Sequence, residues 1–393
     1  MLKQKTFLSI IIFLPSIVFN YFTLSLIDFD HNLSFFTTIS IIFINFLNFI
    51  VVLFFYFFGL KKTIFLSANF LILFTLSDYL VLKIVNLKAI QIYDKKLGWV
   101  LNKNINTKLK QFTEKGLLYD VNYKTSKIKG FREYEDNKIY EKSIFVIGDS
   151  YTAGPFASNE KMYYSVAKNI LKKKNVFFNW YVAGGGGYGT LQELIILKDN
   201  IKLIKPSILI HQFCENDFEN NYFELESQSI LKNQYLIRPF LKDNKIKFPK
   251  NKEARLFRFL YKNSFFFKKV DQILTNQKFM KYNGYYKVKP NDVFLNKAGI
   301  TTEKLIREIR NNIGKDTKYI STNCSTENKK KLLMWKNYIE KANGLSFISP
   351  IEKVEIAQKN GLDVFHEDGK HLNEMGNKIY GEELGKKLLE ILN

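Results

Sequence analysis

Two short stretches of the sequence hold side chains that could together attack an ester. Gly148-Asp149-Ser150 places a hydroxyl directly after an apolar run, and Asp368 stands three positions before His371 near the carboxyl end. A histidine can take the proton of a serine near neutral pH, and an aspartate can hold the imidazole in the tautomer that this requires. These residue types predict a catalytic triad of Ser150, His371 and Asp368.

Two further stretches could supply hydrogen-bond donors for the negative charge that develops on an attacked carbonyl. The glycine-rich loop 183–189 lets backbone N–H groups approach a ligand oxygen, and the N–H of Gly187 is the expected donor. Asn216 follows another apolar run and offers a neutral side-chain N–H. We expect both at an oxyanion site. A phosphate-binding loop is not predicted, because the Lys followed by Ser or Thr that it needs is absent.

Each stretch taken alone also has a purely structural explanation. Ser150 could cap the following helix, the glycines and the Asn-Asp pair could form turns, and a surface histidine is usually only solvated. His366 and Glu367 could also compete for the roles of base and orienting carboxylate. The catalytic interpretation is favoured because each stretch follows a different predicted strand, so that all four would meet at one edge of a sheet.

Strands and helices alternate from about residue 142 to the carboxyl end. Apolar runs predict buried strands at 143–148, 176–182, 207–213, 318–321 and 345–349. Amphipathic stretches predict helices at 162–174, 191–203, 303–313, 327–341 and 373–392. This alternation predicts a parallel α/β sheet with helices on both faces. The interval 219–297 breaks the alternation and is expected to be an inserted cap near the site.

The first 88 residues are expected to form three transmembrane helices. Segments 6–27, 35–60 and from Lys61-Lys62 to about 85 are each long enough to cross a hydrocarbon layer about 30 Å thick. Lysines flank these spans on one side, whereas the turn 28–32 has no Lys or Arg, so the amino terminus is expected in the cytoplasm. Three crossings would place the linker 89–140, which wraps onto the domain, and the domain 141–393 outside. A hydrophobic three-helix domain buried in protein is the alternative.

Composition restricts the partners. The formal net charge of +22 could indicate an anionic partner, but the lysines are spread through the chain, and we expect no nucleic acid. Cys214 and Cys324 are the only cysteines, which excludes a disulfide-built scaffold and a thiolate metal cluster. They could form one bridge or remain free thiols. The predicted chemistry needs neither a metal nor a cofactor.

Together the four stretches resemble the sequence blocks of the SGNH, or GDSL-type, hydrolase superfamily over about residues 90–393. That resemblance implies a three-layer α/β/α flavodoxin-like sheet, with Ser150 as nucleophile, His371 as base and Asp368 orienting it. It also implies an oxyanion hole formed by the N–H of Ser150, Gly187 and Asn216. Residues 94–106, with Leu97-Gly98-Trp99, resemble the lead-in of some bacterial members.

Two positions depart from the pattern of that superfamily. Cys214-Glu215 stand where Gly-Asn is common, and Val182 stands where the second block often begins with Asn. The first departure bears on the shape and charge of the pocket near the oxyanion site, and the second bears on which glycine of the loop is the donor. Neither removes a member of the triad.

The expected function is that of a membrane-anchored serine esterase. Its substrates would be acyl esters, acetyl esters above all, on envelope glycans or lipids outside a bacterial inner membrane. The same acyl-enzyme would serve an O-acyltransferase, because only the acceptor differs. A glycan-binding or assembly protein that keeps the fold without turnover, and docks a protein partner, is the alternative from another class.

Overall fold

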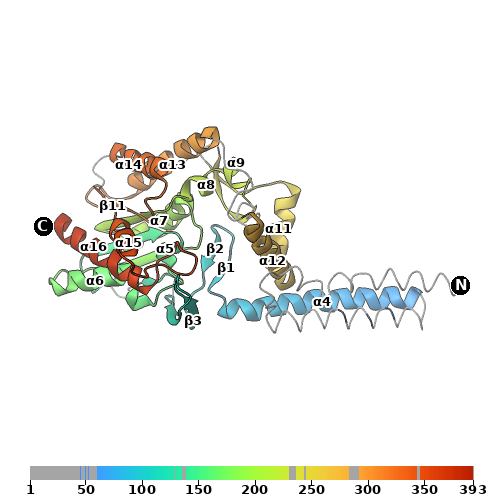
Figure 1. Cartoon of the computed structure of the whole chain (residues 1–393). Coiled ribbons are helices and arrows are strands. Elements are labelled where there is room, and N and C mark those ends of the chain that lie inside the picture. The colour runs from blue at the N-terminus through green and yellow to red at the C-terminus, as the bar shows by residue number, and fades with distance from the viewer. Residues whose placement is uncertain are drawn as a thin grey trace. The chain divides into compact units, whose positions relative to one another are not determined.

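The computed structural model describes residues 60–127, 129–134, 139–229, 236–242, 245–282, 292–342 and 346–392, and the single helical residues Asn45, Phe49 and Val52. These residues belong to two compact units, each of which is described by itself. The larger unit comprises 88–228, 234–254 and 289–393, and the smaller one comprises 1–87, 229–233 and 255–288. The elements are labelled in Figure 1.

A six-stranded sheet of order β12-β11-β8-β6-β7-β5 forms the centre of the larger unit. Five of its strands are parallel: β6 (Ser143–Gly148), β7 (Asn179–Gly184), β8 (Ile208–Phe213), β11 (Lys318–Asn323) and β12 (Ser346–Phe347). The edge strand β5 (Glu133–Tyr134) pairs antiparallel with β7. Taken in chain order, the parallel strands lie 2-1-3-4-5, which is the flavodoxin-like order. The predicted parallel sheet is confirmed.

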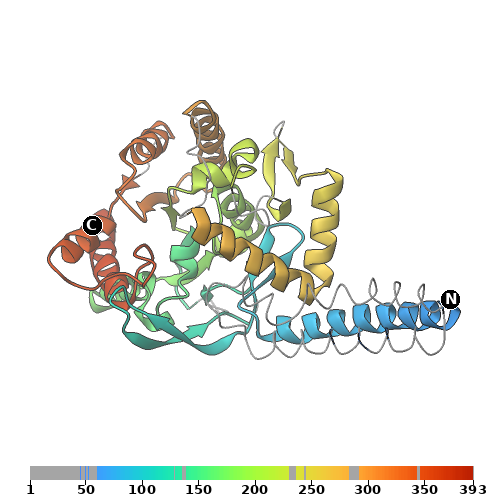
Figure 2. The ribbon, with the colours of Figure 1, turned by 45° about the vertical axis from the view of Figure 1, so that its right-hand side comes forward.

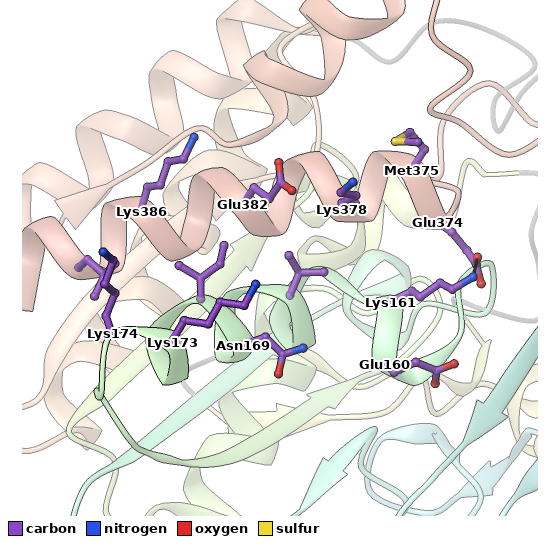
Figure 3. A pocket seen from close by; sticks show the side chains of 13 residues that line it. Glu160, Lys161, Asn169, Lys173, Lys174, Glu374, Met375, Lys378, Glu382 and Lys386 are labelled. Carbon is purple, nitrogen blue, oxygen red and sulfur yellow. Dashed lines mark hydrogen bonds and ion pairs between the residues drawn. The ribbon is translucent and has the colours of Figure 1, made fainter.

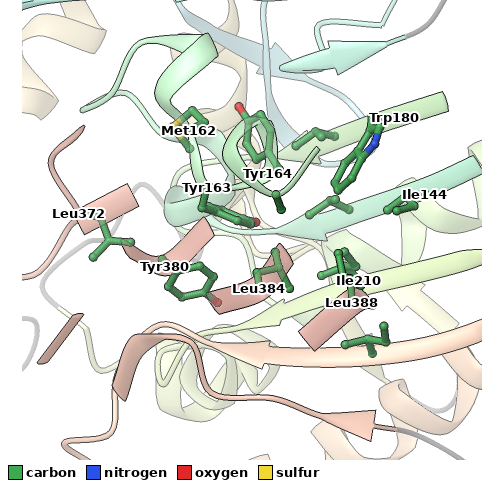
Figure 4. Packing of buried hydrophobic residues seen from close by; sticks show 14 of the residues in the cluster. Ile144, Met162, Tyr163, Tyr164, Trp180, Ile210, Leu372, Tyr380, Leu384 and Leu388 are labelled. Atoms are coloured by element: carbon green, nitrogen blue, oxygen red, sulfur yellow. The ribbon is translucent and has the colours of Figure 1, made fainter. Parts of the chain in front are cut away.

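One face of the sheet is covered by α6 (Tyr163–Lys173), α15 (Ile351–Lys359) and α16 (Glu374–Leu392). Side chains from alternate strand positions point to this face, as the two-residue period of a strand requires. Ile144, Trp180 and Ile210 pack there with Tyr380 and Leu384 in one buried cluster (Figure 4). The two helices α6 and α16 lie side by side (Figures 1 and 2).

The opposite face packs against α7 (Thr190–Ile204) and α14 (Lys329–Lys341), with α13 (Asp292–Asn312) beside α7. Buried polar side chains on this face pair between elements. His211 of β8 contacts Glu193 of α7 through Nε2 at 2.7 Å, and the ring of Trp335 lies 5.1 Å from the His211 ring. The Trp335 indole N–H donates to Ser321 of β11 at 2.8 Å. The expected helices on both faces are therefore present.

The predicted helix 303–313 is longer than expected, because α13 begins eleven residues earlier, at Asp292. Gly299 lies inside it where a Cβ would come 2.4 Å from the Met334 side chain and 2.6 Å from the Tyr338 hydroxyl. A glycine usually weakens a helix, but here it permits the close approach of α14. The end of the expected insertion at 297 therefore falls inside a helix.

Residues 90–134 contain strands that the sequence pattern did not predict. β1 (Gln91–Asp94) pairs with β2 (Gly98–Leu101), and β3 (Asn106–Phe112) pairs with β4 (Leu118–Lys124), both antiparallel. Val121 and Tyr123 are fully buried while their neighbours along β4 are not. Phe112 and Leu118 stand at exposed positions and Thr107 and Gln111 at half-buried ones, so the apolar alternation is weak in the sequence. Short elements complete the unit: α5 (Ser150–Ala153), η1 (Asn159–Lys161), α8 (Asp217–Asn221), α9 (Phe223–Glu226), β9 (Phe240–Lys242) and β10 (Lys245–Lys247).

The smaller unit contains α4 (Leu60–Lys88), most of α11 (Lys252–Asn263) and α12 (Phe265–Tyr282). The third predicted span falls on α4, whose segment Ala68–Lys88 is long and apolar enough to cross a membrane. The first two predicted spans, 6–27 and 35–60, lie outside the described residues apart from the three single helical positions. The three-span topology thus stays a prediction.

Cys214 and Cys324 are joined in a disulfide with their Cα atoms 5.3 Å apart. They directly follow β8 and β11, which are neighbours in the sheet. The bridge links chain positions 110 residues apart. Closing so long a loop restricts the unfolded chain strongly.

Replacing both cysteines by serine should therefore lower the free energy of unfolding by about 2–4 kcal/mol. Urea unfolding of the full chain in detergent measures the change. Reducing agent should move the wild-type midpoint to that of the double variant and leave the variant unchanged. Identical midpoints for the oxidised and reduced wild type would contradict a stabilising bridge.

Candidate active site

Ser150 is the first residue of α5, directly after the tight turn that follows β6 at the carboxyl edge of the sheet. The Asp149 carboxylate caps that turn by accepting the backbone N–H of Tyr151 at 3.0 Å. A Cβ at Gly148 would come 2.3 Å from the Thr152 hydroxyl, so the turn requires glycine there. The Asp149 cap and the close approach of Thr152 to Gly148 thus fix the turn that holds the Ser150 hydroxyl at the edge of the sheet.

The structure brings Ser150, His371 and Asp368 together in a line. His371 Nε2 lies 2.8 Å from Ser150 Oγ, and His371 Nδ1 lies 2.5 Å from Asp368 Oδ2. The other carboxylate oxygen of Asp368 accepts the backbone N–H groups of Lys370 and His371, each at 2.9 Å. Both His371 and Asp368 belong to the loop before α16, so the short spacing lets one loop present both.

The electrostatics of the line favour an ionised Asp368. Burial alone would raise the pKa of Asp368, but the hydrogen bonds and positive charge of His371 and the backbone N–H of Lys370 lower it to about 2. The anion keeps a proton on His371 Nδ1, which leaves Nε2 as an acceptor for the Ser150 hydroxyl. The arrangement can therefore remove the proton of Ser150 as its oxygen attacks an electrophile.

Aromatic side chains that the sequence analysis missed hold the imidazole. The rings of Tyr151 and Phe156 lie 5.1 Å and 4.8 Å from the His371 ring. The Tyr151 hydroxyl also donates to the Lys370 carbonyl, which ties the histidine loop to the serine turn. Their place just after Ser150 is the only signal in the sequence that could have indicated this role.

His366 and Glu367 do not take the places of His371 and Asp368. The His366 ring packs on Phe156 at 4.2 Å, and its Nδ1 lies 3.9 Å from Asp368. Glu367 is exposed, and its backbone N–H donates to Phe112. Among the four side chains considered from the sequence, His371 and Asp368 form the line to Ser150.

The glycine-rich loop lies against the serine turn. A Cβ at Gly184 would come 2.7 Å from the backbone nitrogen of Ala153 and 2.9 Å from the carbonyl oxygen of Asp149. Gly187 has a φ of +68°, a conformation that favours glycine. Its carbonyl accepts hydrogen bonds from Arg238 Nη2 at 2.7 Å and from Asn220 at 3.3 Å. These bonds hold the peptide that follows Gly187, whereas the N–H of Gly187 shares its peptide with the carbonyl of Gly186, which accepts a hydrogen bond from the Trp99 indole.

The segment before the sheet clamps the same loop. The Trp99 indole N–H donates to the Gly186 carbonyl at 2.9 Å, and the Tyr188 hydroxyl donates to the Trp99 carbonyl at 2.6 Å. Gln192, two residues into the following helix, donates to the Leu97 carbonyl at 2.7 Å. The stretch that resembles a family lead-in thus contacts the glycine-rich loop directly.

Asn216 reaches the serine turn through Asp149. Asn216 occupies the N-cap position of α8, but its side chain does not cap that helix. Instead the Asn216 side chain hydrogen-bonds the Asp149 carboxylate, whose Oδ2 lies 3.4 Å from Ser150 Oγ. Burial raises the pKa of Asp149 to about 6, against the lowering effect of its hydrogen bonds. Asn216 is therefore linked to Ser150 through one intervening side chain, that of Asp149.

The two departures from the family pattern have structural partners. Glu215 turns toward α14, where its carboxylate accepts the backbone N–H of Asn328 at 2.8 Å and its carbonyl accepts from Lys331 at 3.0 Å. Cys214 is in the disulfide, and Val182 is fully buried in β7. Cys214 and Glu215 thus join the end of β8 to the end of β11 and to the start of α14.

Other places that could bind a ligand lie apart from Ser150. A hollow of about 800 Å³ lies between α6 and α16, and lysines such as Lys173 and Lys386 lie along it (Figure 3). Its lining is mostly apolar and includes Ile170. The triad residues do not line it. Within the part of the chain that the structure describes, no cluster of three His, Cys, Asp or Glu side chains could hold a metal ion.

No protein-family model and no curated protein matches the chain. Among solved structures it is similar to the family 3 carbohydrate esterase of Clostridium thermocellum, at 14% identity over 64% of this chain and 96% of that one, with a TM-score of 0.33. A member of the lipolytic protein G-D-S-L family from Veillonella parvula shares 13% identity over 62% and 97%, with a TM-score of 0.33. An acetylxylan esterase from Geobacillus stearothermophilus shares 13% over 64% and 93%, with a TM-score of 0.32.

These likenesses concern the fold alone and, at such TM-scores, carry no argument about activity or substrate. The chain's own sheet has the flavodoxin-like strand order, with the four stretches on loops that follow different strands or precede the last helix. What the site can do follows from the contacts of its residues.

The contact of Gly184 with the serine turn generates a prediction about reactivity. Gly184→Ala should slow labelling of Ser150 by a fluorophosphonate roughly 10- to 100-fold, because the new methyl group must displace the turn. Gly186→Ala is the matched control, since the nearest atom to its Cβ would be 3.6 Å away. Labelling rates of the full chain, with circular dichroism to monitor folding, measure the effect. Equal rates in the two variants would contradict it.

The low pKa of Asp368 predicts a pH-dependent contribution to stability. Because the folded pKa of about 2 lies below the ordinary value, the ionised carboxylate stabilises the fold above about pH 4. That contribution is lost as the pH falls from about 4, the ordinary pKa of an aspartic acid, to about 2, the pKa of Asp368 in the folded protein. The difference in unfolding free energy between the wild type and Asp368→Asn should therefore be constant near neutrality and shrink below about pH 4. Urea titrations at several pH values test this, with Glu367→Gln as control; a difference independent of pH would refute it.

Proposed function

We propose that this protein is a membrane-anchored serine ester hydrolase that works outside the cytoplasm. The observation that carries the proposal is the continuous line from Asp368 through His371 to Ser150, with contacts of 2.5 Å and 2.8 Å. A histidine in contact with both a serine hydroxyl and a carboxylate is the arrangement that activates serine for acyl transfer. A protein that only binds glycans would not need it.

In the proposed reaction, Ser150 Oγ attacks the carbonyl carbon of the ester while its proton passes to His371 Nε2. Asp368 stabilises the imidazolium that forms. The tetrahedral intermediate then collapses, the bond to the alkoxide breaks, and His371 returns the proton to the leaving oxygen. Water then attacks the carbonyl carbon of the acyl-enzyme while His371 takes a proton from it. The bond between that carbon and Ser150 Oγ breaks, His371 returns the proton to Ser150, and the acid is released.

The charge on the tetrahedral oxygen would be held by the N–H groups of Ser150 and Gly187 and by the Asn216 amide. Support for this assignment comes from the Gly186 carbonyl, which shares a peptide with the Gly187 N–H and is held by the Trp99 indole, and from the position of Asn216 beside Asp149. Donors that are held in place before the reaction stabilise the oxyanion without reorganising during it.

The anchor and the compartment rest on two features of the chain. α4 contains a segment that is long and apolar enough to cross a membrane. The Cys214–Cys324 disulfide fits an oxidising compartment such as a bacterial periplasm. We therefore propose acyl esters of envelope glycans or lipids, with acetyl as the first acyl group to test. Attack on the acyl-enzyme by a sugar hydroxyl in place of water would make the same site an O-acyltransferase.

Hydrolysis of p-nitrophenyl acetate by the full chain in detergent tests the proposal. Ser150→Ala should lower kcat/KM by roughly 10³-fold or more, because the nucleophile is removed. Ser227→Ala, which removes a hydroxyl that donates only to the Glu224 carbonyl, should not change it. Undiminished activity in Ser150→Ala would exclude Ser150 from the mechanism. Release of acetate from acetylated envelope glycans, with and without a sugar acceptor, would then separate hydrolysis from transfer.

A further inference from the structure

The smaller unit holds a carboxylate within an apolar helix, and that carboxylate is bonded to a second helix. Most side chains of α4 around Asp78 are apolar and exposed, such as Leu73 at 61%. The Asp78 carboxylate accepts the backbone N–H of Phe266, in the first turn of α12, at 2.8 Å. The Phe74 ring, one turn earlier in α4, meets the Phe266 ring edge-on at 6.2 Å. The start of α12 is therefore attached to α4 beside Asp78.

The residues of α4 indicate where a bilayer would end. A hydrocarbon layer about 30 Å thick takes about 20 helical residues, which, counted from Lys61-Lys62, reach to about residue 82. Lys83 is exposed there, with its ammonium 5.0 Å from the centre of the Tyr79 ring. Tyrosine and lysine are favoured at the boundary with water, whereas a lysine inside hydrocarbon is costly. Asp78 and the attached end of α12 thus lie within about one or two turns of the boundary.

The helix α11 packs on α12 through aromatic rings. The Phe257 ring meets the Phe267 ring edge-on at 5.1 Å and stacks on the Tyr261 ring at 5.9 Å. The Lys268 ammonium of α12 lies 4.8 Å from the centre of the Tyr261 ring. Phe257 and Tyr261 are one turn apart, so they define the face of α11 that is turned to α12.

The other face of α11 is apolar, exposed and bordered by cations. Leu256 and Phe259 are 59% and 62% exposed and lie nearly one turn apart. Arg255 and Lys262 are exposed on the same side of the helix. Large apolar side chains next to basic ones are typical of helices that lie in the plane of a membrane surface, where the apolar groups enter the boundary and the cations meet anionic headgroups.

We propose that α11 and α12 form a second membrane contact, lying on the bilayer at the exit end of α4. Leu256 and Phe259 enter the boundary between headgroups and acyl chains, and Arg255 with Lys262 bind the phosphates of anionic lipids. The bilayer is the occupant because α12 is attached to α4 at the level where the bilayer would end. The inference rests on the proposed anchor and does not depend on the esterase activity.

A spin label on the full chain in liposomes tests this site by site. Phe259→Cys carries the label, and Leu73→Cys on α4 and Leu333→Cys, 60% exposed on α14, are the matched references for hydrocarbon and water. The native cysteines are paired, so an unmodified wild type measures the background. Collision rates with oxygen, which partitions into lipid, and with a water-soluble nickel chelate report the depth of each label.

The ratio of the collision rate with oxygen to the collision rate with the chelate should be several-fold higher for the label at 259 than for the label at 333. It should be lower for the label at 259 than for the label at 73. Values at 259 equal to those at 333, with 73 in hydrocarbon, would overturn the surface contact and leave the anchor in place. Collision rates at 73 equal to those at 333 would mean that α4 does not lie in hydrocarbon and would overturn the anchor itself. Low collision with both reagents at 259 would mean that protein covers this face, which also overturns the inference.

The lipid composition tests the charge. Adding phosphatidylglycerol to phosphatidylcholine liposomes should move the label at 259 deeper. Arg255→Gln combined with Lys262→Gln should abolish that shift, while the label at 73 keeps its depth. No shift on adding phosphatidylglycerol would overturn the binding of anionic headgroups.

Discussion

The loops around Ser150 must satisfy their carbonyl oxygens without using the N–H groups that a substrate would need. Loop backbone cannot do this by itself, because it lacks the regular pairing of a helix or a sheet. Two buried guanidinium groups do it instead. Arg132 donates to the carbonyls of Ala153 and Gly154 at 2.8 Å and 3.0 Å, and Arg238 donates to the Gly187 carbonyl at 2.7 Å. A guanidinium has five donors and no acceptor, so it binds carbonyls and leaves backbone N–H groups free.

Both cations come from outside the alternating strands and helices. Arg132 belongs to the segment before the sheet, and Arg238 belongs to the segment after α9. Each also lies over an aromatic ring, Arg132 at 3.9 Å from the Tyr123 ring centre and Arg238 at 5.0 Å from that of Trp99. A desolvated cation gains from such a ring, which partly offsets the cost of its burial. The segments expected as linker and insertion therefore complete the backbone of the site.

The site depends partly on the alternating strands and helices and partly on segments outside them, and this explains which features could be predicted from the sequence. Strands buried on both faces are continuous apolar runs, so β8 at Ile208–Phe213 could be placed within one residue, and the polar groups after such strands mark the sheet edge. The strands β3 and β4 have apolar Phe112 and Leu118 exposed and polar Thr107 and Gln111 half-buried, so they show no comparable pattern. The contact of Arg238 with Gly187 joins positions 51 residues apart and leaves no local signal. The Cys214–Cys324 pairing likewise needed the order of β8 and β11 in the sheet.

The two carboxyl groups nearest Ser150 have opposite environments, and the difference fits the proposed roles. Asp368 is partly exposed and receives three hydrogen bonds, which lower its pKa to about 2 and keep it ionised beside His371. Asp149 is buried, and burial raises its pKa to about 6, so its charge is less favoured next to the hydroxyl. At neutral pH a carboxyl group with that pKa is still mostly ionised, but it takes up a proton more readily than Asp368 does. Two nearby carboxyl groups with such different pKa values suit different tasks, and in the proposed mechanism Asp368 is the stable anion behind the imidazole.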